Sequence, residues 1–353
     1  MRQRLWPLAA AWSLVLLTAV TAPAQPDETG ARRRLSFDTV IGVQDMLLED
    51  ADWPTQVIVD AAGSWQIGRH LFANVRPVVW RVNGAWEVLL DQASVRYEAG
   101  RETLVRVEAG RFPSPVGLGM TENRANVNPG VLWCHRLYYS PLPNLGPGLP
   151  LQSLVSATYP VGVTATVTAS AWDVRAALMD RAPVAFWTAP TRLTAPTHAA
   201  IGGGYTPVQG LRLGVVAAWG ELSDAAREAS TYRLVNVEAD WAFASTRLSG
   251  EWTRDRFDTA GGIRTSDGWT AQVRQTLAPR WFVHSRATRG ASPQVAATGR
   301  VTPRTYLSVD STVGYLVSPE LTLRAGHTAL RGWTAPTTDH QIGVSIVWAR
   351  RWW

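Results

Sequence analysis

The residues of this sequence that could do chemistry are charged side chains, and their types suit the binding of ions rather than bond-breaking. The 34 Lys and Arg positions are all Arg. Arginine forms bidentate hydrogen bonds to carboxylate and phosphate groups, so a group of arginines can bind anions. The candidates in the first half of the chain are Arg76, Arg96, Arg106, Arg111 and Arg124, with Glu108 and Glu122 beside them.

A second group of candidates is acidic and lies in the second half of the chain. It consists of Glu238, Asp240 and Glu251. If the arginines and these acids line opposite walls of one pore, they set up a transverse field that biases the passage of ions. The excess of Arg near a constriction would then favour a weak anion preference. The alternative is that inner charges pair, for example Arg96 with Glu98 or Glu108, and only keep a wet interior solvated.

Other kinds of site are not supported by the sequence. The six His are far apart and lack metal-site spacing, and a single Cys excludes an intramolecular disulfide. Cys134 and His135 could suggest a nucleophile and its base, but sequence neighbours seldom point at one another, and no third group orients them. We therefore expect no enzyme, no metal and no cofactor. The net charge of +6 is interleaved with Asp and Glu, which argues against nucleic-acid binding.

The N-terminus predicts export. Two arginines precede an apolar stretch from Leu8 to Val20, and small residues follow it. This order is typical of a signal peptide cut after Ala24. The apolar stretch is shorter than the ~20 residues that a membrane-spanning helix needs. We therefore expect a signal peptide at 1–24 and a short periplasmic segment at 25–34.

Beyond residue 34 the hydrophobic residues alternate singly with polar ones, as in the run Val163, Ala165 and Val167 with its intervening threonines. A period of two places one set of side chains on each face of a β-strand. An apolar face and a polar face fit a membrane barrel, with lipid outside and water inside. The predicted strands, about sixteen in number, are 35–46, 55–67, 70–82, 86–98, 102–112, 151–159, 162–174, 198–206, 209–220, 231–243, 246–257, 267–278, 281–290, 303–317, 320–331 and 339–350.

The predicted connections alternate strictly between short and long. The short ones carry Gly or Pro, as tight turns require, for example at Gly68-Arg69 and Pro160-Val161. Outer-membrane barrels have an even number of strands, short periplasmic turns and longer outer loops. We therefore expect an all-β, antiparallel transmembrane barrel over 35–353, with an infolded constriction loop at 113–150 after the fifth strand. The longer connections are predicted at 112–150, 175–197, 221–230, 258–266, 291–302 and 332–338.

Tryptophan supports the same architecture, because 18 Trp are too many for one core. The amphipathic Trp ring gathers at the head-group level of a membrane. The chain also ends in Trp after an amphipathic stretch, which resembles the C-terminal signal that barrel-assembly machinery binds in outer-membrane proteins. The candidates for these aromatic girdles are Trp80, Trp86, Trp172, Trp219, Trp241, Trp252, Trp269, Trp281 and Trp348.

Residues 110–117, with the sequence GRFPSPVG, resemble the "G-R/K-F-x-x-P-x-G" stretch of the phosphate-selective porin (porin O/P) family. The resemblance covers mainly residues 91–143. It implies an outer-membrane channel whose anion sites use Lys and Arg on strands and infolded loops. This sequence departs from that pattern because it has no Lys, so the resemblance does not carry phosphate selectivity to this chain.

Together these features predict a porin of the bacterial outer membrane through which small hydrophilic solutes or anions diffuse passively. The expected partners are the lipid bilayer with lipopolysaccharide, the barrel-assembly machinery and, by resemblance to porins of this size, further copies in a homotrimer. The alternative is a closed or plugged barrel that acts as a structural or adhesive surface protein. A barrel-embedded hydrolase would need a nucleophile, a base and an orienting group, and the sequence shows no such set.

Overall fold

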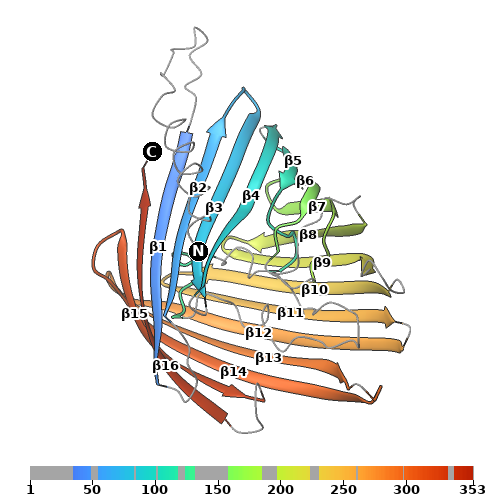
Figure 1. The fold of residues 1–353 in the computed structure, drawn as a ribbon. Helices are drawn as coiled ribbons and strands as arrows, with labels where there is room; N and C mark the ends of the chain where they lie inside the picture. The colour runs from blue at the N-terminus through green and yellow to red at the C-terminus, as the bar shows by residue number, and fades with distance from the viewer. Residues whose placement is uncertain are drawn as a thin grey trace, which may run out of the picture.

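The computed structural model describes residues 35–48, 55–82, 85–100, 102–117, 124–131, 158–184, 197–222, 230–259, 261–296, 298–332 and 338–352. Sixteen antiparallel strands close into a barrel, with each strand hydrogen-bonded to its neighbours in sequence and β1 to β16 (Figure 1). The predicted fold class is confirmed. No helix in the described ranges has the length and apolar character needed to span a bilayer.

The strands vary in length from eight to seventeen residues. They are β1 (Leu35–Leu48), β2 (Gln56–Gln66), β3 (Leu71–Val82), β4 (Ala85–Ala99), β5 (Leu104–Arg111), β6 (Val161–Thr168), β7 (Trp172–Met179), β8 (His198–Val208), β9 (Leu211–Leu222), β10 (Ser230–Phe243), β11 (Thr246–Thr259), β12 (Gly262–Ala278), β13 (Trp281–Val295), β14 (Val301–Leu316), β15 (Leu321–Arg331) and β16 (Thr338–Arg351).

The sixth and seventh strands differ from the prediction, whereas every other predicted strand coincides with an observed one. Residues 162–174, predicted as one strand, hold most of β6, a turn and the start of β7. The turn consists of small residues, and the Ala169 amide donates to the Trp172 carbonyl at 2.8 Å. Alternating hydrophobicity continues through this turn, so the sequence pattern alone did not locate it. Of the predicted strand at 151–159, residues 158 and 159 lie outside any strand, and 151–157 lie outside the described residues.

Connections at one end of the barrel, which we call the turn end, have four residues or fewer. At the opposite end, the loop end, the connection between β5 and β6 is the longest and spans residues 112–160. Strict alternation of lengths is wrong at two loop-end connections, 83–84 and 260–261, which have two residues each. The predicted loop at 258–266 is shortened because β11 and β12 extend into it, and Gly262 adopts a φ of 100° that suits a tight turn.

The predicted turn at Pro160-Val161 is also wrong. The Pro160 carbonyl accepts a hydrogen bond from the Phe112 amide at 3.1 Å, and the Thr158 carbonyl accepts one from the Ser114 amide at 3.0 Å. These bonds continue the pairing of β5 with β6 beyond the strands themselves. Proline fits here because only its carbonyl is used.

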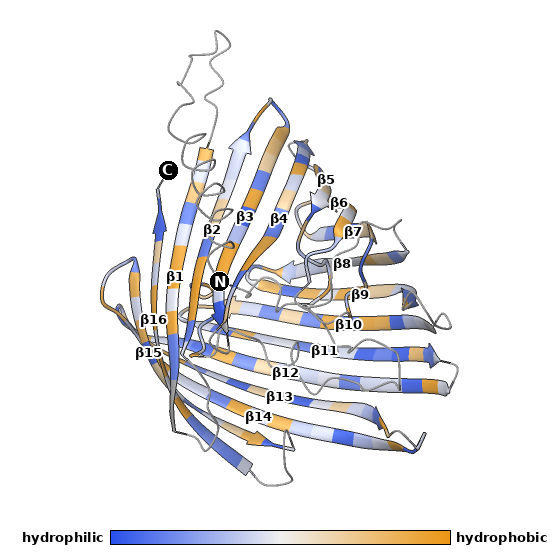
Figure 2. Cartoon of the chain, viewed as in Figure 1, coloured by the Kyte–Doolittle hydropathy of each residue, from blue (hydrophilic) through white to orange (hydrophobic). Residues whose placement is uncertain are grey.

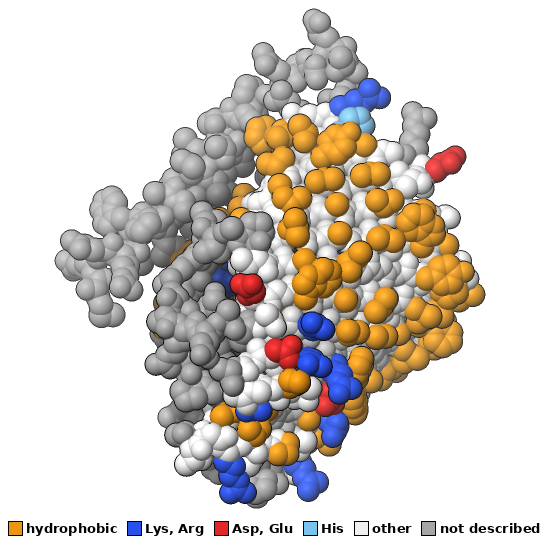
Figure 3. Space-filling view, turned by 90° about the vertical axis from the view of Figure 1, so that its right-hand side faces the viewer, with side chains coloured by type: hydrophobic (Ala, Val, Ile, Leu, Met, Phe, Trp, Pro, Cys, Tyr) orange, Lys and Arg blue, Asp and Glu red, His pale blue; other side chains and the backbone are white. Residues whose placement is uncertain are grey.

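The outer face of the barrel is apolar. Alternate residues along the strands, such as Val174, Val215 and Val313, are large exposed hydrophobics. Bands of opposite hydropathy therefore alternate along the ribbons in Figure 2, and Figure 3 shows an apolar surface with charged side chains gathered beside it. The predicted girdle residues that are exposed are Trp86, Trp172, Trp219, Trp241, Trp252 and Trp281.

Trp80 is an exception among the predicted girdle residues. Trp80 stands opposite Ile58 of β2, and the register between β2 and β3 has no bulge. Along β3, Trp80 occupies an even-numbered position, as do the buried Asn74 and Arg76. Val75 between these two is 40% exposed, so even-numbered residues of β3 face inward. The prediction for Trp80 is therefore wrong, because the alternation of the strand and not the residue type sets the direction of its side chain.

Candidate pore lining

The inner face of the barrel divides into two sectors. On β7–β11 the inner side chains near the loop end form an apolar cluster with residues of the loop-end connections, and we call this the apolar sector. From β12 through β16 and from β1 to β4 most buried inner side chains are polar or charged, and we call this the charged sector. The strand residues of the apolar sector are Ala177, Met179, Ala200, Val216, Ala218, Leu222, Tyr232, Leu234 and Phe257.

Arg76 of β3 lies in a buried ion-pair network of the charged sector. Its guanidinium donates to the Asp60 carboxylate at 2.8 Å and to the Tyr159 hydroxyl at 2.6 Å. Asp60 is 0% exposed and also accepts a hydrogen bond from Nε of Arg124 at 2.9 Å. Arg124 in turn donates to the Asp38 carboxylate of β1 at 2.5 Å. The two predicted candidates Arg76 and Arg124 therefore lie together, and each has acidic partners.

A β-bulge adds a third acid to this network. The register of β3 with β4 shifts next to Arg76, where β4 has the extra residue Asp91. A bulge changes which side chains face inward, and Asp91 is 8% exposed with its carboxylate 3.9 Å from the Arg76 guanidinium. The sequence prediction missed Asp38, Asp60 and Asp91. Strand alternation could have found the first two, but no sequence pattern marks the bulge.

The predicted arginines nearer the turn end also have partners. Glu98 of β4 pairs with Arg96 at 3.0 Å and with Arg106 at 2.7 Å. Glu108 of β5 is 8% exposed and accepts a hydrogen bond from Gln92 at 2.9 Å. These contacts agree with the alternative hypothesis from the sequence, in which inner charges pair with one another and keep the interior solvated.

Arg111, at the end of β5, and Arg124, in the β5–β6 connection, each lie close to other charged side chains. Burial, and then the charge of Arg111, lowers the pKa of Arg181, which follows β7. Burial acts to lower the pKa of Arg124, but its hydrogen bond to Asp38 and the charge of Asp60 raise it above the ordinary value. Arg124 therefore stays charged and anchors its loop to β1 and β2. Glu122 lies outside the described residues.

The predicted acids lie on the inner face of β10 and β11. Glu238 contacts Arg212 of β9, and Asp240 pairs with Arg247 of β11 at 2.8 Å. Glu251 is 3% exposed and stands directly opposite Glu238 in the register of these strands. Among the described residues, Glu238 and Asp240 therefore form ion pairs with arginines of neighbouring strands on the same wall.

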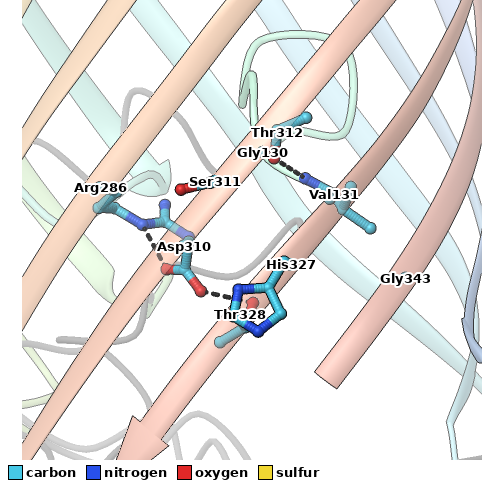
Figure 4. A pocket seen from close by; sticks show the side chains of 10 residues that line it. Gly130, Val131, Arg286, Asp310, Ser311, Thr312, His327, Thr328 and Gly343 are labelled. Atoms are coloured by element: carbon cyan, nitrogen blue, oxygen red, sulfur yellow. Dashed lines mark hydrogen bonds and ion pairs between the residues drawn. The ribbon is translucent and has the colours of Figure 1, made fainter. Parts of the chain in front are cut away.

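A group of arginines that the sequence prediction missed lies in the charged sector. Arg274 of β12 stands directly opposite His284 of β13, Arg286 lies two residues from His284 along β13, and Arg324 belongs to β15. One carboxylate, Asp310 of β14, faces them and accepts a hydrogen bond from Nε of Arg286 at 3.2 Å (Figure 4). His284 and Arg286 are 2% and 0% exposed and lie on the inner face of β13. In the part of the chain that the structure describes, three guanidiniums and the Asp310 carboxylate therefore lie around His284.

Residues 124–131 of the β5–β6 connection contact this same wall. The Val131 amide donates to the Thr312 hydroxyl at 3.2 Å, and Arg324 donates to the Gly130 carbonyl at 3.1 Å. Figure 4 shows Gly130 and Val131 beside β14 at a small pocket that Arg286 also lines. This part of the connection therefore contacts inward-facing side chains of β14 and β15, while Arg124 at its start contacts β1 and β2.

Residues 112–117 of the same connection pack in the apolar sector instead. Phe112 and Val116 are 1% and 0% exposed and belong to the cluster with the strand residues of β7–β11. Ala182 and Val184, which follow β7, join this cluster. The described parts of the connection therefore contact both sectors of the inner wall.

Two polar side chains lie in the apolar sector without partners. Asp255 and Asn236 are each 0% exposed, and none of their side-chain oxygen or nitrogen atoms has a hydrogen-bond partner. Asp255 stands opposite Leu234 of β10. Burial of a carboxylate without a partner is unfavourable. In the part of the chain that the structure describes, no three His, Cys, Asp or Glu side chains are grouped so that they could hold a metal ion.

Comparison with solved structures places this architecture among known barrels. An anion-selective porin from Comamonas acidovorans superposes with a TM-score of 0.57 at 12% sequence identity, over 91% of this chain and 100% of that chain. The chain has the porin fold. OmpF of Salmonella typhi gives a TM-score of 0.59 at 11% identity, over 90% of this chain and 98% of that chain. The trimer form of OmpT, an outer membrane protein of Vibrio cholerae, gives 0.60 at 10% identity, over 90% and 99%.

No protein-family model matches the sequence, and a search of curated proteins found no relative. The porin fold therefore rests on structure and not on sequence similarity. The resemblance of residues 110–117 to the phosphate-selective porins stays a prediction.

Proposed function

We propose that this chain is a porin of the bacterial outer membrane that lets small hydrophilic solutes diffuse passively. The observation that carries the proposal is a closed barrel of sixteen strands that is apolar outside and has a charged sector inside. Barrels of 16–18 strands are wide enough to hold an aqueous channel. Export by a signal peptide at 1–24, insertion by the barrel-assembly machinery and assembly into a homotrimer belong to the same proposal.

A weak anion preference is the second part of the proposal. It is supported by Arg274, Arg286 and Arg324, which lie around His284 with the carboxylate of Asp310 in the described part of the inner wall. An excess of fixed positive charge attracts anions and repels cations at close range. The loop at 113–150 would narrow the channel beside these arginines, since residues 124–131 contact the same strands.

Planar-bilayer recording of the refolded full chain tests both parts. We expect stepwise single-channel currents and, under a salt gradient, a reversal potential with the sign of an anion-preferring pore. Arg274→Gln should shift that potential toward cations, whereas Arg331→Gln, an exposed position on the outer face of β15, should not. A clear cation preference of the unaltered protein would overturn the anion preference, while stepwise currents would still support the pore.

A closed or plugged barrel with a structural or adhesive role is the second candidate. The apolar sector favours it, because Phe112, Val116, Ala182 and Val184 fill part of the interior as a core would. Protein that inserts into the bilayer, migrates as a folded barrel and gives no current would support this candidate and exclude the porin.

A further inference from the structure

The apolar outer face is interrupted by arginines near the loop end of β10–β13. Arg233 of β10, Arg254 and Arg256 of β11 and Arg289 of β13 are all exposed. They alternate with buried inner residues, for example Asp255 between Arg254 and Arg256, so their side chains project from the outside of the barrel. A charge on the lipid face is costly at the membrane midplane and becomes tolerable near the interface. These positions are therefore expected to lie at the membrane surface.

Tryptophans next to these arginines also indicate a position at the membrane surface. Trp252 and Trp269 stand opposite each other on β11 and β12, and Arg254 lies two residues from Trp252 toward the loop end. Two residues of a strand span about 7 Å. Trp219 of β9 stands directly opposite Arg233. Since interfacial tryptophans mark the head-group region, the arginines lie where lipid phosphates lie.

Among the described residues, the four arginines of this patch outnumber the three acids beside them, Asp258, Asp267 and Glu221. Arg233 stands directly opposite Arg256 in the register, and Arg254 is two residues from Arg256 on the same face. Like charges directly opposite on neighbouring strands repel each other. Arg256 has Asp258 at 3.2 Å. Arg233 and Arg254 form no ion pair with any residue in the described ranges.

Two further acids lie beside the patch. Asp267 of β12 stands directly opposite Arg254 in the register, and its carboxylate is 3.8 Å from Arg289, with both of these side chains nearly half exposed. Glu221 of β9 is exposed on the outer face opposite Thr231, two residues from Arg233 along β10. Arg233, Arg254 and Arg256 therefore form a compact basic group that a bound anion would stabilise, and guanidiniums match phosphate oxygens with paired hydrogen bonds.

We propose that Arg233, Arg254 and Arg256 bind the phosphomonoester head group of a membrane lipid of the lipid A type. This assignment rests on the proposed outer-membrane location. The neighbouring tryptophans contact the acyl chains and sugar of the same lipid, while the arginines hold its phosphates. The patch is a lipid site on the outside of the barrel and takes no part in conduction.

Native mass spectrometry of the refolded full chain in detergent tests the site directly. The probes are lipid A, phosphatidylglycerol, phosphatidylcholine and inorganic phosphate. We compare the unaltered protein with the triple variant Arg233→Gln, Arg254→Gln and Arg256→Gln and with the matched control Arg331→Gln. The expected loss of lipid A affinity is about 100-fold in the triple variant, since each arginine near a membrane surface contributes about fivefold to binding of an anionic lipid. The control should bind lipid A as the unaltered protein does.

Each alternative outcome overturns the proposal. Equal lipid A binding by all three proteins would show that the patch is only a solvated face. Binding of phosphatidylglycerol as tight as that of lipid A would exclude a phosphomonoester site, and displacement of lipid A by equimolar inorganic phosphate would indicate a site for the free anion. Folding is checked by heat-modifiable migration in gels. Because the measurement needs no current, a failed lipid site leaves the porin proposal standing, and a non-conducting barrel leaves the lipid site testable.

Discussion

The apolar and charged sectors of the inner wall belong to one closed sheet, yet they are stabilised in different ways. In the apolar sector, residues 112–117 and 182–184 are packed against strands β7–β11 as in a soluble core. In the charged sector, residues 124–131 are held by the ion pairs of Arg124 with the buried Asp60 and the partly exposed Asp38, and by the hydrogen bond of the Val131 amide to Thr312. Packing is non-directional, whereas ion pairs fix particular atoms.

This difference assigns different roles to the two sectors. The apolar sector fills space, because its side chains exclude water and leave no polar surface for a solute. The charged sector can stay hydrated, and its fixed charges can act on ions. A single connection, between β5 and β6, is tied to both. Changes in each sector should therefore have separable effects on stability and on conduction.

The largest expected effect comes from the charged sector. Arg76→Ala would leave Asp60, which is 0% exposed, with Arg124 as its remaining partner, and would remove the ion pair between Arg76 and Asp91. Removing one partner of a buried ion pair costs about 3–5 kcal/mol. We expect a loss of that size in the free energy of unfolding, measured by urea titration of the refolded barrel in detergent.

A matched double variant separates charge from packing at this site. Arg76→Met with Asp60→Asn removes both charges and keeps most of the volume, so it should be more stable than Arg76→Ala. If the double variant unfolds at the same urea concentration as Arg76→Ala, the network stabilises the barrel through packing rather than through charge.

The corresponding change in the apolar sector is Phe112→Ala. Phe112 is 1% exposed, and truncation of a buried Phe costs about 3–4 kcal/mol. Because Phe112 anchors the start of the β5–β6 connection, we also expect a larger single-channel conductance than in the unaltered protein. Phe243→Ala on the lipid-exposed outer face, where Phe243 is 40% exposed, is the control and should leave conductance unchanged.

Acids in the two sectors should respond to the same substitution with opposite signs. Asp255 has no hydrogen-bond partner, so Asp255→Leu should raise the free energy of unfolding by about 1–3 kcal/mol. Asp310 accepts hydrogen bonds from Arg286 and from Thr328 at 2.8 Å, so Asp310→Leu should lower it. Urea titration of both variants measures the difference. If both substitutions lower the free energy of unfolding, then the Asp255 side chain stabilises the folded barrel, contrary to this expectation.

The sequence predicted the barrel and the direction of most inner charges because both follow from one period of two. It located Arg76 and Glu238 on the inner face for this reason. It did not find the turn at 169–171, where small residues continue the alternation. It also did not find the bulge at Asp91 or which charges pair across strands. Pairing depends on the register between strands, and a single strand carries no information about that register.

The smallest expected effect tests whether the predicted arginines of β3–β5 select ions at all. Arg106 is 43% exposed in its side chain and pairs with Glu98, an arrangement worth under about 1 kcal/mol. Arg106→Gln should therefore change stability little, and its reversal potential should match that of the unaltered protein. The comparison variant is Arg274→Gln, in the group of arginines around His284, which should shift the reversal potential toward cation preference. If Arg106→Gln shifts the potential as much as Arg274→Gln does, selectivity arises from the wall of β4 and β5 as well and is not confined to the arginines around His284.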